Sequence, residues 1–162
     1  MKKRAIFIFG TLAVLAIVAV AWACSKADAS ESESEVQQTE VITLTEALTS
    51  WDDTVLPPYP QGDSTKLTIL KYVIPPHTNL ARHFHPIMSF GYLIEGDLTV
   101  VSDEGKEKTF HAGETVVETV NTWHHGENRG NTPVVLVVSY NGTTTTPLVV
   151  KDGEGEPSDY QK

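Results

Sequence analysis

Residues 82–96 read RHFHPIMSFGYLIEG, and this stretch decides both the fold and the candidate site. His83 and His85 are one residue apart, and alternate side chains of a β-strand point to the same face, so both imidazoles project together. After Pro86 the chain enters a strand-like run that ends at Glu95-Gly96, which is typical of a tight turn. Two imidazoles at this spacing can reach one metal ion, but the pair alone is a weak signal until a third ligand joins it.

Short β-rich runs separated by turn residues lie on both sides of this stretch, and such a pattern predicts an all-β sandwich or barrel. The expected strands are 66–74, 91–94, 98–102, 106–110, 114–118, 133–140 and 143–150. The turns at 95–97 and 111–113 are expected to close two hairpins. Residues 40–51 are open to either a short helix or a leading strand.

A second histidine segment, TVNTWHHGEN at residues 119–128, precedes the strand expected from Pro133. It offers His124 and His125 as candidates for the third ligand. With two hairpins in between, the two histidine segments are expected to be neighbours in a sheet that folds back on itself.

Together the two segments resemble the paired motifs of the cupin family, G-x5-H-x-H-x3-4-E-x6-G and G-x5-P-x-G-x2-H-x3-N. The matching positions are His83, His85 and Gly96 in the first motif, and Gly113, His124 and Asn128 in the second. The resemblance covers about residues 67–140. It implies an all-β fold, a single double-stranded β-helix (jelly-roll) barrel of two antiparallel sheets, with a metal site in its mouth.

The chain departs from these motifs at four positions. Ser89 stands where the acidic ligand falls, and glycine or proline positions are taken by His77, Thr119 and Asn121. The resemblance therefore implies a three-histidine site made by His83, His85 and His124. Imidazole ligands suit several divalent metals, and the identity stays open among Fe, Mn, Ni and Zn.

Other readings of these side chains remain open. The motif offset favours His124 over His125, which is expected to face outward or to support a ligand. Glu118 is a less favoured substitute for the missing acid, Glu95 is assigned to the turn, and His77 and His111 are expected in solvent. The barrel could also have lost its metal. The residues expected either to line the pocket or to pack in the core are Met88, Phe90, Tyr92 and Trp123.

The charge balance limits the classes of molecule that the protein can bind. The chain has 21 acidic and 12 basic residues, a formal net charge of -9. From Cys24 onward only 9 basic residues remain, because Lys2, Lys3 and Arg4 precede it, and the balance is 9 − 21 = −12. Such a surface repels phosphate backbones, which excludes nucleic acid as a partner.

The N-terminus has the features of a targeting segment. A basic MKKR is followed by an uncharged apolar run and by AWAC at residues 21–24. We expect a signal peptide or anchor over 1–23 and a periplasmic or cell-envelope protein attached to the membrane as a lipoprotein through Cys24. A plain signal peptide or an uncleaved anchor is the alternative. Residues 24–38 are expected to be a disordered acidic tether, 39–150 the barrel, and 151–162 a disordered tail.

Two functions of different classes fit these features. The first is a metal-dependent dioxygenase that acts on a small enol, diketone or phenolic substrate, since three neutral imidazoles leave the full charge of the ion for an anionic ligand. The second is a non-catalytic module that binds a small ligand or a metal. No catalytic acid or base stands out in either case. A homodimer is expected, because exposed sheet edges must be covered.

Overall fold

The computed structural model describes residues 39–59 and 64–160. The signal or anchor segment, Cys24 and the acidic tether fall outside the described residues. Residues Glu40–Lys162 form one compact unit. Within the described ranges, no helix is both long and apolar enough to cross a membrane.

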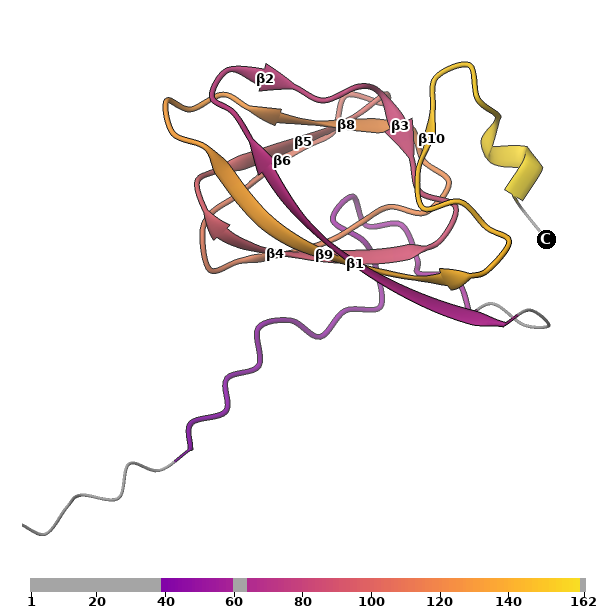
Figure 1. The fold of residues 1–162 in the computed structure, drawn as a ribbon, viewed down its shortest axis with the longest axis horizontal. Helices are drawn as coiled ribbons and strands as arrows, with labels where there is room; N and C mark the ends of the chain where they lie inside the picture. The colour runs from indigo at the N-terminus through magenta and orange to yellow at the C-terminus, as the bar shows by residue number, and fades with distance from the viewer. Residues whose placement is uncertain (1–38, 60–63, 161–162) are drawn as a thin grey trace, which may run out of the picture. The chain divides into compact units, whose positions relative to one another are not determined.

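The compact unit consists of two antiparallel sheets that face each other (Figure 1). The first sheet has four strands in the order β1 (Thr65–Ile74), β9 (Val134–Thr143), β4 (Met88–Glu95) and β7 (Thr115–Val117). The second has the order β10 (Val150–Lys151), β3 (His83–Phe84), β8 (His124–Asn128), β5 (Leu98–Ser102) and β6 (Glu107–Phe110), and β2 (Thr78–Asn79) also pairs with β8. The all-β barrel expected from the sequence is confirmed.

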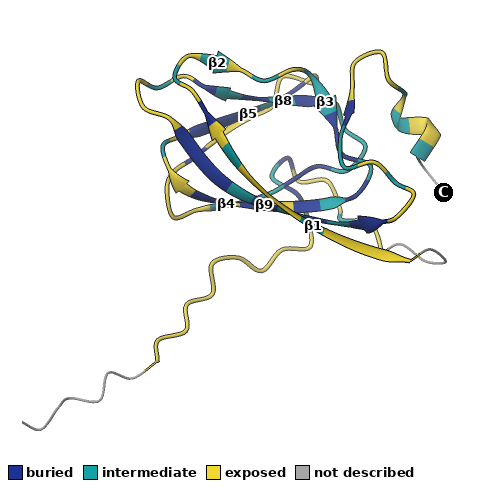
Figure 2. Ribbon diagram, in the orientation of Figure 1, coloured by how far each residue is buried: buried dark blue, intermediate teal, exposed yellow. Residues whose placement is uncertain are grey.

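The core lies between the two sheets, and its residues belong to the strand segments drawn dark blue in Figure 2. In β4, burial alternates residue by residue from Ser89 to Leu93, so that one face of the strand points inward. The cluster of buried apolar side chains includes Leu93, Leu98, Val100, Phe110, Val116, Leu136 and Val138. This packing fixes the register of the strands, since a slip of one residue would reverse the two faces.

The two turns predicted as hairpins join different sheets, and that prediction was wrong. β4 and β5, on either side of Gly96, lie in separate sheets, as do β6 and β7 on either side of Gly113. The hairpin in this region is β5 with β6. At Gly96 (φ 77°) an added Cβ would lie 2.6 Å from the carbonyl oxygen of Pro133, so glycine allows the chain to cross closely between the sheets.

The two ends of the barrel also differ from expectation. Residues 40–51 form neither helix nor strand, and the region contains only an isolated bridge between Thr49 and Val55. Most of the expected strand at 143–150 is irregular: β9 ends at Thr143, and β10 begins only at Val150. The tail has more structure than a disordered segment: a 3-10 helix spans Pro157–Tyr160. Its Tyr160 ring lies 5.7 Å from that of Phe84, and this contact attaches the tail to the barrel.

Candidate metal site

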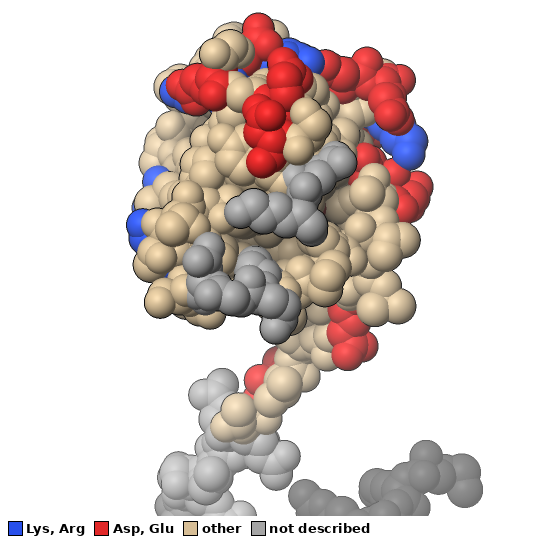
Figure 3. Space-filling view, turned by 90° about the vertical axis from the view of Figure 1, so that its right-hand side faces the viewer, with Lys and Arg blue, Asp and Glu red and all other residues tan. Residues whose placement is uncertain are grey.

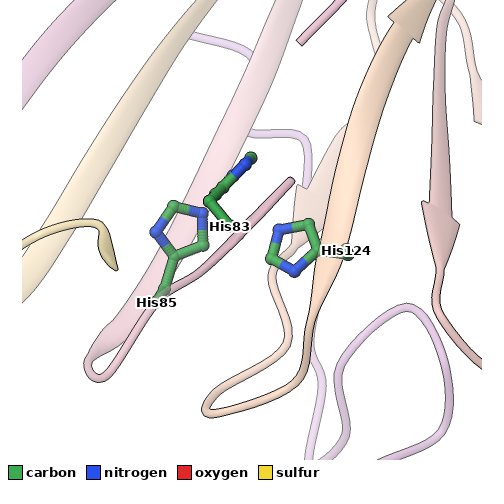
Figure 4. Close-up of side chains that lie close together, drawn as sticks. All are labelled: His83, His85 and His124. Atoms are coloured by element: carbon green, nitrogen blue, oxygen red, sulfur yellow. The ribbon is translucent and has the colours of Figure 1, made fainter. Parts of the chain in front are cut away.

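Three imidazoles converge in the barrel (Figure 4). Two come from the neighbouring strands β3 and β8, and the third comes from His85, the residue directly after β3. His83 in β3 and His124 in β8 are direct cross-strand partners. His85 lies two residues beyond His83 and therefore on the same side of the chain. One nitrogen of each histidine lies within 4.8 Å of one nitrogen of each of the others.

Each of these imidazoles is held by its Nδ1 atom. His83 Nδ1 donates to the carbonyl oxygen of Ala81 at 2.7 Å, and His85 Nδ1 to that of Leu148 at 2.9 Å. His124 Nδ1 donates to the carbonyl oxygen of Thr122 at 2.8 Å. A carbonyl oxygen can only accept, so the proton of each neutral ring is on Nδ1 and the Nε2 lone pair is free. Such anchoring of the second nitrogen is what metal-binding histidines require.

Burial keeps the three rings neutral. His85 and His124 are buried, whereas His83 is partly exposed. Burial lowers the pKa of all three histidines, and that of His85 falls to about 3. The neighbouring imidazole of His124 lowers the pKa values of His83 and His85 further. Neutral imidazoles are the metal-binding form, so the rings are ready to bind at neutral pH.

A carboxylate and a hydroxyl group lie beside the histidines. Glu118 Oε2 is 3.6 Å from His124 Nε2, which is too long for a hydrogen bond. Within the described residues, neither of these two atoms nor Ser89 Oγ has a hydrogen-bond partner, although all three are buried. Burial raises the pKa of Glu118 to about 7. Buried polar atoms without partners are costly, and the two that lie 3.6 Å apart, on Glu118 and His124, indicate a place for a cation.

The remaining histidines lie away from this cluster. His125 Nε2 pairs with Glu127 at 2.8 Å, on the side of β8 opposite to His124. His77 contacts Asn131, and His111 contacts Asp97, both at the exposed surface. The expected orientation of His125 and the solvent positions of His77 and His111 therefore agree with the structure.

Asn128, the last matching residue of the second motif, has a structural role. Its side chain is buried, and Nδ2 lies 2.9–3.0 Å from the carbonyl oxygens of Ile74, Pro75 and Thr132. Its Oδ1 accepts from the backbone N–H of Gly130. Asn128 therefore connects the end of β1 to the loop after β8.

Sequence reasoning gave too little weight to two residues. Glu118 was only a less favoured substitute, and Thr119 was noted only as a replacement for proline. Thr119 is fully buried, and its Oγ1 lies 3.2 Å from His124 Nδ1, so it helps to hold that ring. The signal for Glu118 was the alternation of 116–118, because Val116 and Glu118 share the inward face, whereas Thr119 had no such signal.

Comparisons with known proteins agree with this architecture. The family model described as a cupin domain matches residues 70–140. No curated protein sequence matches the chain.

Several solved structures are similar to the chain. An oxalate oxidase structure is 25% identical, covering 56% of this chain and 51% of that one, with a TM-score of 0.47. A protein with a double-stranded β-helix domain from Klebsiella pneumoniae is 16% identical, covering 70% and 97%, also with a TM-score of 0.47. A cupin domain from Bordetella pertussis is 19% identical, covering 51% and 88%, with a TM-score of 0.44. The matched region is thus about half of the oxalate oxidase chain.

Proposed function

We propose that the chain, whose residues 70–140 match the cupin-domain family model, is an exported non-haem metal-dependent dioxygenase. It binds one divalent ion through His83, His85 and His124 and acts on a small enol, diketone or phenolic substrate. The observation that supports this most strongly is the common anchoring of three Nδ1 atoms, which leaves the Nε2 atoms unprotonated in three rings that each have one nitrogen within 4.8 Å of the others.

The bound ion would supply Lewis acidity and coordination positions for an anionic, bidentate substrate and O2. The protein itself orients and shields these groups. Of the three imidazoles only His83 is partly exposed, so a substrate reaches the site from that side. The ring of Tyr140 lies 5.5 Å from that of His85, and its hydroxyl group is bound to that of Tyr72 at 2.8 Å, which provides a rigid apolar wall.

The acidic surface disfavours nucleic acid and other polyanions as partners. Figure 3 shows a face on which carboxylate side chains gather at one end and basic ones are few. Export rests on residues 1–24 alone, where the basic start, the apolar run and Cys24 follow one another.

Oxygen uptake by the metal-loaded protein tests this function. The full chain, prepared in mild detergent without a histidine tag, is loaded with Fe²⁺ and supplied with acetylacetone or catechol. Uptake that requires both metal and substrate and is lost in His85→Ala supports the dioxygenase. A protein that holds the metal but consumes no oxygen with any enol or phenol is instead the non-catalytic binding module.

A further inference from the structure

Position 89 is occupied by a serine, but the residue opposite it in the sheet is a glutamate. β4 and β7 are antiparallel, with Phe90 paired to Val117, so the next pair outward is Ser89 and Glu118. The backbone N–H of Glu118 donates to the carbonyl oxygen of Ser89 at 2.9 Å, which continues the ladder by one step. Both side chains are buried and point into the barrel.

We propose that Glu118 supplies a fourth, carboxylate ligand to the metal held by the three histidines. This inference rests on the proposed function, because it needs a metal at the histidine cluster. A carboxylate on β7 would thus replace the acid that is missing from β4.

The distance between Glu118 and His124 fits direct ligation, although among the described residues the ligand atoms that all lie within 4.8 Å of one another belong to the three histidines alone. Two ligand atoms that each lie about 2.1 Å from one ion at a tetrahedral angle are about 3.4 Å apart. The observed separation of Glu118 Oε2 and His124 Nε2 is 3.6 Å. A hydrogen bond between them would require a shorter distance, and His124 has already placed its ring proton on Nδ1, toward Thr122.

The two facing atoms therefore present lone pairs to each other. Among the described residues, both lack a hydrogen-bond partner. A cation between them would satisfy both atoms at once, whereas an ordinary packing role for Glu118 would leave its Oε2 buried without a partner. With Glu118 ionised, three neutral imidazoles and one carboxylate reduce a divalent ion to a net charge of +1, which one monoanionic enolate balances.

The test is Zn²⁺ affinity, measured by competition with a chromophoric chelator on the full chain in mild detergent. Glu118→Gln keeps the size of the side chain and removes the charge, and we expect it to weaken Zn²⁺ binding at least ~10-fold. Glu95→Gln removes the same charge from an exposed position and should leave the affinity unchanged. The melting temperature of the metal-free Glu118→Gln protein should not fall, because a buried carboxyl group has been replaced by a neutral one.

A second variant separates ligation from packing. Ser89→Glu combined with Glu118→Gln returns one carboxylate to the same pair of positions, and we expect affinity to recover to within ~3-fold of the wild type. The proposal is overturned if Glu118→Gln binds Zn²⁺ as the wild type does, or if the double variant binds no better than Glu118→Gln. In both cases the three-histidine site stands. If the wild-type protein binds no Zn²⁺, the proposed function fails as well.

Discussion

Glu118 gives the metal-free protein a pH dependence that one substitution isolates. Burial raises its pKa from 4.5 to about 7, whereas in the unfolded chain it ionises near its ordinary value. Between these values the folded state holds a proton that the unfolded state has lost. The resulting contribution of Glu118 to the free energy of unfolding is fully present below pH 4.5 and is lost as the pH rises through about 7.

The size of this change in unfolding free energy follows from the pKa shift of Glu118. One pKa unit corresponds to about 1.4 kcal/mol, so a rise from 4.5 to about 7 corresponds to roughly 3 kcal/mol, most of it between pH 5 and 8. Glutamine does not ionise. We therefore expect metal-free Glu118→Gln to gain about 2–3 kcal/mol of unfolding free energy over the wild type when the pH is raised from about 5 to about 8.

The histidines act in the opposite direction, and those whose pKa values Glu118 does not affect, such as His85, cancel in this comparison. Burial lowers the pKa of His85 from 6.5 to about 3, so the unfolded chain takes up a proton first as the pH falls. Stability is lost from pH 6.5 downward in both proteins. The difference between wild type and variant therefore reports Glu118 together with its attraction to His83, whose pKa the Glu118 carboxylate raises.

Urea unfolding followed by tryptophan fluorescence, in excess chelator, measures this difference at each pH. Glu95→Gln serves as the control and should show no pH-dependent gain, since Glu95 is exposed. If the difference between Glu118→Gln and the wild type is the same at both pH values, Glu118 is already ionised in the metal-free fold, and the reasoning from its burial is refuted.

The remaining predictions concern the fold, the assembly and the N-terminus. Asn128→Ala should lower the unfolding free energy by about 2–4 kcal/mol in urea, because it leaves buried carbonyl groups unsatisfied; a loss under about 0.5 kcal/mol would contradict that role. Ile69 and Phe90, 61% and 50% exposed, lie on the same outer face of the four-stranded sheet, and such apolar patches mark interfaces. Light scattering should therefore find a dimer that Ile69→Lys dissociates, and a wild-type monomer at micromolar concentration would count against it. Cys24→Ser should release the protein from membranes or block its processing in a fractionation experiment; unchanged attachment would rule out lipidation there.

Much of the barrel could be predicted from the sequence because local signals determine it. Alternation of apolar residues and glycine-containing turns located most of the strands. Two positions where the family motifs carry glycine, His77 and Asn121, still adopt positive φ values of 54° and 55°. The turns therefore survive these replacements, and asparagine tolerates this conformation better than most residues.

What the sequence could not provide is which strand meets which. A turn such as that at Gly96 reports a change of direction, but the packing of the whole barrel decides which sheet receives β5. The pairing of Ser89 with Glu118 depends on the same long-range arrangement. For that reason Glu118 was only a less favoured substitute in the sequence, although it lies opposite Ser89, which takes the position of the missing acid.

Zn²⁺ titration of the full chain tests the three-histidine site most directly. At neutral pH the wild-type protein should bind one equivalent per chain, and His124→Ala should weaken binding at least ~10-fold. His125→Ala, which changes the adjacent outward imidazole, should bind Zn²⁺ like the wild type. A wild-type chain that binds no divalent metal, or loss of binding in His125→Ala with retention in His124→Ala, would contradict the site.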